Sequence, residues 1–384
     1  MTTNRPPVRV LIPFHTAHLY GMEKAVIQTF DCLRPEIQPL FLIARAAQTR
    51  RLPVLEELIR RKLPFSFFSD RGEWSRVGWP RSPAHLANMV LSALLGNRDV
   101  LRATWNCDAL YLPSISYAAY ALAAMLYCRA TGRRVYHHFH DLPARPQRRL
   151  SLLRFLISDH VHNAHGGWEI AASLYPWLHR WPNHVLPQRV EVPPEEPLEP
   201  DAASVLAGSR NVVFVGQVSR GKGIEVLLEA FRIVAAEEAD VRLQVVGGLR
   251  EQSAERIVDC CERVSFWGYR ADVSTFLQSA YMCVHPSLPS CMVESFGRAA
   301  AEAQALGVPV VCFASGLLPD IVRNGETGLV CDDESAGCLA SAILRLLQDP
   351  LLRNTMSQNA RLRFNEISSI GAVREAWLAC LIRE

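Results

Sequence analysis

Short apolar runs recur along this chain at intervals that leave room for a helix between neighbours, and they fall into two series. Such runs are typical of parallel strands buried on both faces, with the intervening segments forming helices that cover the sheet. The sequence therefore predicts two α/β units. The first series comprises residues 8–13, 40–44, 109–112, 135–140 and 160–164, and the second comprises 212–215, 241–246, 264–266, 282–285, 308–313 and 328–331.

The composition changes abruptly to proline and glutamate over residues 187–200, between the two series. A chain of 384 residues exceeds what one hydrophobic core usually organises. We therefore expect two Rossmann-like domains, residues 1–187 and 188–360. A final segment, residues 361–384, is expected to be helical without further strands.

Charge is distributed unevenly between the two halves. Residues 1–190 hold 24 Lys+Arg against 12 Asp+Glu, whereas residues 191–384 hold 17 against 26. A basic half suits a phosphate-rich acceptor or an anionic membrane surface, although a solvated arginine-rich face explains it equally well. Arginines 145, 148, 149 and 154 alternate with leucines and Phe155, and together with Trp74 and Trp79 they suggest a surface that lies at a membrane interface.

The cysteines and the N-terminus favour a cytoplasmic protein. The 11 cysteines lie mostly in apolar stretches and form no CxxC pair, which is typical of reduced, buried side chains. Residues 1–9 are polar and lead straight into a strand, so no secretory signal is visible. The most apolar helical candidate, residues 115–128, is shorter than the roughly 20 residues needed to span a bilayer.

The segment from Met282 to Phe313 contains the strongest functional signal. A strand ends in His-Pro-Ser, and a loop ending in Ser295, Phe296 and Gly297 leads into an alanine-rich helix. The first amides and the dipole of that helix suit an anionic ligand. Glu294 stands before the helix and Glu302 lies about two turns later, so both carboxylates can border one site.

A glycine-rich turn follows the first strand of the second series. It contains Gly216, Gln217, Arg220, Lys222 and Gly223. Its amides and the Lys222 ammonium could hold a diphosphate through charge-assisted hydrogen bonds. The spacing of a Walker A loop is absent.

Histidines gather in the first half of the chain. His137, His138 and His140 close one predicted strand, and a second group, His160, His162 and His165, follows the next. An alternating strand would place His138 and His140 on one face. Imidazoles bind zinc readily, so a metal site is one interpretation, and strand-end histidines that make structural hydrogen bonds are the other. We favour no metal site, because no accompanying carboxylates complete a hydrolase signature.

Together these motifs resemble the retaining glycosyltransferases of family 4, which have the GT-B fold. That fold consists of two Rossmann-like domains facing each other across a cleft, with a C-terminal helix that crosses back to the first domain. The resemblance implies that Glu294 lies beside the transferred sugar, that Glu302 holds the nucleotide ribose, and that His140 approaches the sugar. Gly216, Lys222 and the amides of residues 295–297 would bind the donor diphosphate.

The sequence departs from the family pattern at two positions. Gln217 stands where arginine is usual, so phosphate binding depends on whether Arg220 compensates. Tyr20 replaces the first glycine of a loop whose second glycine, Gly21, would let the backbone approach the donor phosphate. No Asp-x-Asp triplet provides a divalent-metal clamp.

The resemblance implies a metal-independent hexosyltransferase that needs no cofactor. It would move a hexose from a nucleoside diphosphate sugar to a saccharide acceptor, expected to be lipid-linked, in exopolysaccharide or surface-glycan synthesis. No nucleic acid is expected as a partner. Two alternatives remain open: a catalytically weak subunit that binds nucleotide sugars, and a metal-dependent hydrolase that uses the histidine groups.

Overall fold

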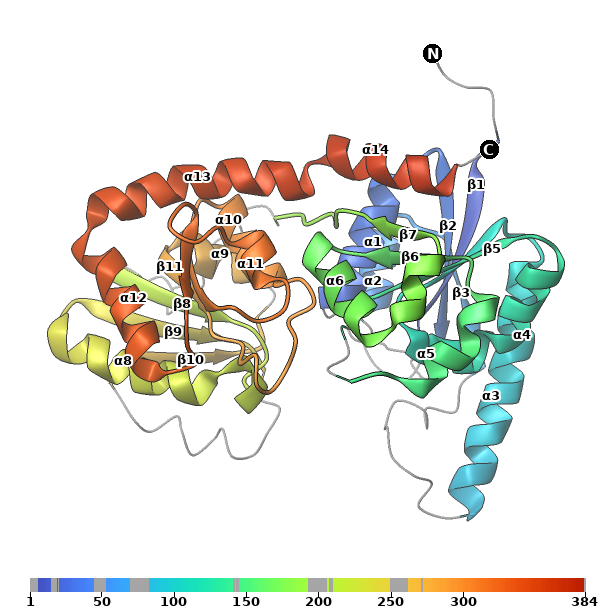
Figure 1. Ribbon diagram of the computed structural model, residues 1–384, viewed down its shortest axis with the longest axis horizontal. Coiled ribbons are helices and arrows are strands. Elements are labelled where there is room, and N and C mark those ends of the chain that lie inside the picture. The colour runs from blue at the N-terminus through green and yellow to red at the C-terminus, as the bar shows by residue number, and fades with distance from the viewer. Residues whose placement is uncertain are drawn as a thin grey trace. The chain divides into compact units, whose positions relative to one another are not determined.

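The protein divides into two compact units, each a parallel sheet covered by helices (Figure 1). The first unit comprises Met1–Arg189 with Ile370–Glu384, and the second comprises Val190–Ser369. The expected boundaries lie slightly earlier, after residues 187 and 360. The computed structural model describes residues 6–14, 19, 21–44, 53–69, 83–140, 142, 145–192, 206, 210–248, 262–270 and 272–382, with residues 83–92 described as a helical backbone only.

The first unit is built on seven parallel strands in the order β3-β2-β1-β4-β5-β6-β7. The strands between its two edges are mostly buried, as the sequence predicts, and β1, β2 and β4 contain buried apolar runs. The edge strands β3 and β7 were not predicted, because each is short and partly exposed and has a single strand neighbour. The strands are β1 (Val8–Phe14), β2 (Ile37–Ala44), β3 (Phe65–Phe68), β4 (Ala109–Leu112), β5 (Arg134–His138), β6 (Asp159–His162) and β7 (Asn183–Val185).

Helices connect these strands. In the described ranges, short 3-10 segments add turns to the connections: η2 (Ile115–Tyr117), η3 (Arg154–Leu156) and η4 (Pro176–Arg180). The helices are α1 (Gly21–Cys32), α2 (Pro53–Arg60), α3 (Pro83–Thr104), α4 (Ala118–Ala130), α5 (Arg148–Leu153) and α6 (His165–Leu174).

The last helix of the chain, α14 (Ile370–Leu381), packs within the first unit beside α1 (Figure 1). Trp377 is 1% exposed, and its ring centroid lies 5.6 Å from that of Phe30. Its indole Nε1 donates to the Pro187 carbonyl at 2.8 Å, and Arg374 forms an ion pair with Glu36 at 2.7 Å. These contacts join the C-terminal segment to the first unit.

The second unit contains six parallel strands in the order β10-β9-β8-β11-β12-β13. All six strands of the second series are found, with ends within two residues of those expected. The strands are β8 (Arg210–Val215), β9 (Val241–Val246), β10 (Val264–Gly268), β11 (Ala280–His285), β12 (Val310–Phe313) and β13 (Gly328–Cys331). The helices are α8 (Ile224–Glu237), α9 (Val273–Gln278), α10 (Arg298–Ala305), α11 (Leu318–Ile321), α12 (Ala336–Gln348) and α13 (Pro350–Ser368), with the 3-10 turn η5 (Arg220–Lys222) before α8.

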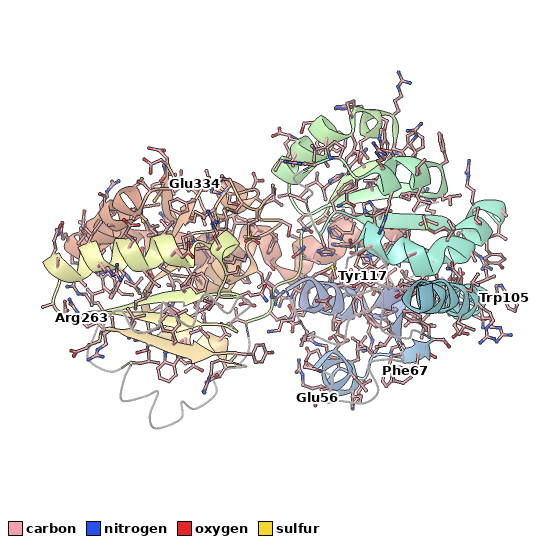
Figure 2. The ribbon with its side chains drawn as sticks, turned by 90° about the horizontal axis from the view of Figure 1, so that it is seen from below. Glu56, Phe67, Trp105, Tyr117, Arg263 and Glu334 are labelled. Atoms are coloured by element: carbon pink, nitrogen blue, oxygen red, sulfur yellow. The ribbon has the colours of Figure 1, made fainter. Side chains whose placement is uncertain are left out.

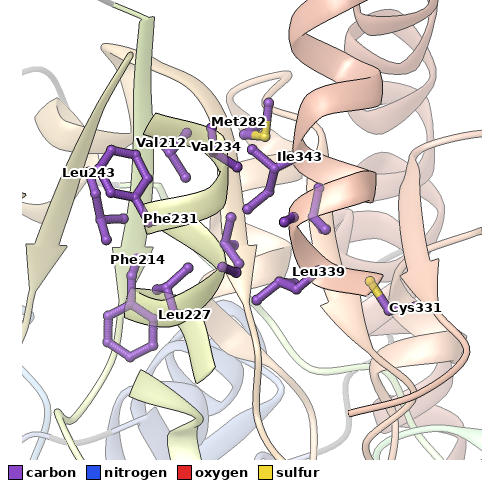
Figure 3. Close-up of a cluster of buried hydrophobic side chains, with 14 of the residues drawn as sticks. Val212, Phe214, Leu227, Phe231, Val234, Leu243, Met282, Cys331, Leu339 and Ile343 are labelled. Atoms are coloured by element: carbon purple, nitrogen blue, oxygen red, sulfur yellow. The ribbon is translucent and has the colours of Figure 1, made fainter. Parts of the chain in front are cut away.

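Helices α8 and α12 cover one face of this sheet (Figure 3). Phe231 of α8 and Ile343 of α12 are fully buried against the strand residues Val212 and Leu243. A second cluster, which includes Phe276 and Phe296, fills the opposite side. Both faces of the sheet are thus covered by helices, so a ligand can reach the sheet only at the ends of its strands.

Strand order reverses direction between β8 and β11 in the second unit. In open α/β sheets, ligands bind beyond the carboxyl ends of the strands at such a reversal. The segments that leave β8 and β11 there are the glycine-rich turn and the His-Pro-Ser segment. The topology therefore brings the two predicted donor motifs to one place.

Candidate functional site

The glycine-rich turn is held directly against the segment that follows β11. Gly223 has a φ of +71°, and a Cβ added there would lie 1.9 Å from the carbonyl oxygen of Pro286. The Leu288 amide donates to the Gly221 carbonyl at 3.0 Å. Only glycine fits at position 223, because the backbone is left-handed and the neighbouring chain leaves no room for a side chain. The contact fixes Lys222 beside the end of β11.

The Glu294 carboxylate is the centre of the site. Its Oε2 atom accepts from Lys222 Nζ at 2.5 Å, from His285 Nε2 at 3.1 Å and from Ser287 Oγ at 3.1 Å. The residue is 8% exposed. A carboxylate can only accept, so the His285 proton lies on Nε2.

Glu294 is ionised in this setting. Burial by itself would raise the pKa of this carboxyl, but the hydrogen bonds and charge supplied by His285 and Lys222 outweigh burial and hold the pKa well below its usual range. The three donors all converge on Oε2, whereas no described residue donates to Oε1. The carboxylate is therefore oriented through one oxygen, and the other can accept from a ligand hydroxyl.

The backbone on both sides of Glu294 is also fixed. Its carbonyl accepts from the Leu317 amide at 2.8 Å, and a Cβ on Gly316, whose φ is +53°, would lie 2.1 Å from that oxygen. Glu334, which follows β13, accepts from the Ser290 amide at 2.8 Å (Figure 2). The loop between β11 and α10 is thus anchored at two points, so Glu294 is held on a rigid support.

The start of α10 follows this loop. Gly297 is the N-cap, with a φ of +76° and no side-chain cap. The Phe296 ring is buried in the core, whereas Ser295 is half-buried. Glu302 pairs with Arg298 one turn earlier on the helix, at 2.8 Å. The two glutamates of the predicted pair thus differ: Glu294 is buried and held by three donors, whereas Glu302 is a partly exposed helix residue that pairs with Arg298.

The remaining predicted donor residues line the glycine-rich turn. Gly216 follows β8 directly, and Gln217 and Arg220 are both exposed. Arg220 forms no ion pair with any residue that the structure describes. In the first unit, Gly21 is the exposed first residue of α1, and Tyr20 lies outside the described residues.

His140 belongs to a buried network beyond the end of β5. Gln188 Nε2 donates to His140 Nδ1 at 3.1 Å, so the imidazole proton lies on Nε2, 3.3 Å from Tyr111 Oη. Tyr111 contacts His138 Nδ1 at 2.5 Å, and His138 Nε2 contacts Asn163 Oδ1 at 2.6 Å. As expected, the two histidines share one face, with ring centroids 3.7 Å apart.

Burial keeps this imidazole neutral. It lowers the pKa of His140 to about 3, and the ring is 4% exposed. Because both nitrogens contact protein groups, the side chain must leave these partners before it can contact a sugar. The catalytic role expected for His140 stays a prediction.

We call His137, His138, His140, His160 and His162 the histidine cluster; all five are buried. Burial lowers the pKa of each of them, to about 3 for His137 and about 4 for His162. Among the residues whose placement is described, no group of three or more His, Cys, Asp or Glu side chains could hold a metal ion. His165, which was expected to join these histidines, is exposed and lies beside Glu169 on α6. These contacts favour a structural role for the cluster.

Sequence reasoning did not assign a role to His285 or Ser287. Both were visible in the His-Pro-Ser strand end, but the pattern gave no sign that their side chains turn toward a glutamate later in the chain.

The nine cysteines that the structure describes are all free thiols. No helix in the described ranges is long and apolar enough to cross a membrane.

Residues 209–349, which contain this site, match the family model described as "Glycosyl transferases group 1". A capsular polysaccharide biosynthesis glycosyltransferase of Staphylococcus aureus is 31% identical over 162 residues, 41% of this chain and 42% of that protein. A D-inositol 3-phosphate glycosyltransferase of Arthrobacter is 30% identical over 168 residues, 41% of this chain and 39% of that protein. The chain therefore spans about two fifths of the length of the curated relatives that it matches.

The similarity in structure extends over the whole chain. The crystal structure of Anabaena Alr3699/HepE in complex with UDP and glucose superposes with a TM-score of 0.78 and 17% sequence identity, covering 98% of this chain and 99% of that one. At this identity the likeness shows the fold, and it agrees with the two parallel sheets described above. The chain therefore has the GT-B fold, and its second unit carries a group 1 glycosyltransferase domain.

Proposed function

We propose that the chain transfers a hexose from a nucleoside diphosphate sugar to a saccharide acceptor, as a retaining enzyme of the family 4 type that needs neither a metal ion nor another cofactor. The observation that carries the proposal is Glu294. It is a buried, ionised carboxylate at the strand reversal, with three donors on Oε2 and Oε1 left for a ligand. It lies within the segment that matches the glycosyltransferase family.

We assign the donor to the second unit. Glu294 Oε1 would accept from a sugar hydroxyl, and the half-buried Glu302 would bind the ribose. Lys222 lies at the carboxylate in this structure, where its ammonium can serve both Glu294 and a phosphate, since it has three protons to donate. Positive charge here would stabilise the departing diphosphate without a metal.

The backbone of the turn supplies further donors for phosphate. Gly216 would allow close approach of the chain, and amides at residues 295–297 lie at the start of α10. Gln217 contributes no charge, so we assign the compensating charge to Arg220, which is exposed and forms no ion pair within the described ranges.

We propose that the acceptor is lipid-linked and that the product enters an exopolysaccharide or surface glycan. The Staphylococcus relative, which is named for capsular polysaccharide biosynthesis, supports this class of product. The protein would act in the cytoplasm, at the inner face of the membrane, with its basic first unit toward anionic lipid. The free thiols of the described cysteines fit a reducing compartment.

A thermal-shift screen of UDP-, GDP- and ADP-sugars in EDTA tests the donor assignment. A ligand that binds only the native state adds about 2.7 kcal/mol at a hundredfold excess over its dissociation constant. We expect one nucleotide class to raise the midpoint in wild type and not in Lys222→Met. In Glu302→Ala the shift should be smaller. If no donor shifts the wild-type midpoint, the donor site is wrongly assigned.

Turnover separates an enzyme from a catalytically weak binding subunit, an alternative that the departure at Gln217 motivates. The donor that shifts the midpoint is incubated with the protein in EDTA, and released nucleoside diphosphate is measured with and without saccharide acceptors. Release that depends on Glu294 identifies a transferase. A midpoint shift without any release identifies the binding subunit.

A further inference from the structure

An apolar surface is exposed on one side of the first unit, on α4, α5 and η3. Leu122 and Leu126 of α4 are 40% and 53% exposed, and they lie one turn apart on the same face of the helix. Leu152 of α5 is 77% exposed and Phe155 of η3 is 60% exposed. The helix α4 contacts η3, so these side chains belong to neighbouring elements. We call them the apolar surface.

A pocket opens within this region, between the start of α4 and α5. Its volume is about 220 Å³, and it is lined by Ile115, Ala118, Ala119, Leu122, Arg149 and Leu153. Leu122 belongs both to the pocket and to the apolar surface, so the two are continuous. Arg149 is the one charged residue among those lining the pocket.

The chain segment that contributes Arg149 and Leu153 to the pocket is positively charged. Arg145, Arg148 and Arg149 are exposed, and none of them forms an ion pair with a described residue. No acidic residue occurs between Arg145 and Ser158. Arg154 lies over the Phe155 ring at 4.5 Å, which places a further cation against the exposed aromatic side chain. An apolar pocket with cations at its wall and rim matches an amphiphile that has a hydrocarbon chain and an anionic head.

We infer that this pocket binds an anionic membrane lipid, with the first carbons of one acyl chain between α4 and α5 and the lipid phosphate at Arg149. The inference rests on the proposed membrane association and gives it a location. Arginine suits the phosphate because its guanidinium forms paired hydrogen bonds. The exposed leucines and Phe155 would enter the acyl boundary around the pocket, as the apolar face of an interfacial helix does.

Flotation with phosphatidylglycerol vesicles tests this inference on the full chain. Ala119→Phe fills the pocket without changing charge, and Leu122→Ser makes its wall polar as a milder variant. Arg149→Gln removes the charge, and Arg102→Gln removes an exposed charge on α3 as the matched control. Thermal unfolding without lipid confirms that each variant is folded. Glycerol phosphate as a soluble competitor distinguishes a lipid from a free phosphate.

We expect Ala119→Phe and Leu122→Ser to weaken vesicle binding at least about tenfold through lost burial of chain carbons. Arg149→Gln should weaken it about fivefold, through loss of one charge at the surface. Arg102→Gln should bind like wild type, and glycerol phosphate should not compete. The inference is overturned if the two pocket variants bind the vesicles like wild type, or if the wild-type protein does not bind these vesicles. It is also overturned if glycerol phosphate displaces the wild-type protein from the vesicles.

The donor-induced midpoint shift, measured on the same variants, keeps this inference separate from the proposed function. Loss of vesicle binding with the donor shift intact supports the pocket and leaves the donor site unaffected. Vesicle binding without any donor shift in wild type contradicts the transferase proposal alone. A protein partner in place of a lipid would appear as wild-type protein that fails to float with the vesicles.

Discussion

Replacing Lys222 by methionine tests whether the ion pair with Glu294 holds the candidate site together. Methionine keeps most of the side-chain volume and removes the ammonium, which leaves the buried carboxylate with His285 and Ser287 as its described donors. The Lys222 and Glu294 side chains are only 19% and 11% exposed, so solvent compensates little. Breaking a buried pair costs about 3–5 kcal/mol, and the two remaining donors reduce the expected loss to about 2–3 kcal/mol.

The loss of stability caused by Lys222→Met can be measured in the second unit separately from the first. For a unit of this size the expected loss lowers the midpoint by about 4–12 °C. Urea unfolding followed by hydrogen exchange of peptides from η5, β11 and α10 reports this unit separately from the first. Removing the cation raises the pKa of Glu294 in the variant above its value in wild type. The loss should therefore shrink once the pH falls below the pKa of Glu294 in the variant, because a protonated Glu294 no longer needs the ammonium.

A double-mutant cycle with Glu294→Gln supplies the decisive control. Glutamine removes the negative charge while keeping the shape, so the double variant contains neither buried charge of the pair. We expect a coupling free energy of about 1–3 kcal/mol between the two positions. Strictly additive losses, or a Lys222→Met variant as stable as wild type, would refute the argument that the pair positions the carboxylate.

Three further predictions concern stability. Gly223→Ala should destabilise the second unit by more than about 2 kcal/mol, because the backbone there is left-handed and the new Cβ would clash with Pro286. Gly221→Ala is the control, because its Cβ would lie 3.4 Å from the nearest atom. Urea unfolding should show little loss of stability in that control. The histidine cluster should make the first unit less stable as the pH falls below the usual 6.5, because folded-state pKa values near 3 and 4 mean that unfolding takes up protons. Each such residue contributes about 1.4 kcal/mol per pH unit, so a slope near zero between pH 4 and 6 in unfolding curves would contradict this. Trp377→Ala should cost about 3–5 kcal/mol in the first unit, and hydrogen exchange of α1 peptides should rise, whereas unchanged exchange would show that α14 contributes no stability.

Most strands that sequence reasoning placed correctly have a buried apolar run, although β10, a partly exposed edge strand, was also found. The centres of β8 and β11, residues 212–214 and 282–284, are apolar runs that are fully or almost fully buried, because helices cover both faces of the parallel sheet. β3 and β7 were missed because each is short and partly exposed, so neither forms a buried apolar run that stands out in the sequence. The expected end of the strand at His140 was two residues too long, because His138 is the last residue in the ladder.

The candidate site was predicted in part. Glu294 and Lys222 were chosen from separate motifs, and the structure joins them in one ion pair. That contact depends on Gly223 lying against Pro286, a close approach between segments more than sixty residues apart. No local pattern encodes it, and for the same reason the donors His285 and Ser287 could not be identified from sequence.

The sequence by itself determined the two-unit α/β architecture, and it contained the motifs of Lys222, Gly223 and Glu294, because the period of apolar runs and these short motifs are local properties of the chain. Tertiary structure alone decided which oxygen of Glu294 stays open, that the His140 ring is enclosed by Tyr111 and Gln188, and that an apolar pocket opens beside Arg149. These features arise from contacts between distant segments, whose hydrogen bonds and packing exist only once both sheets have formed.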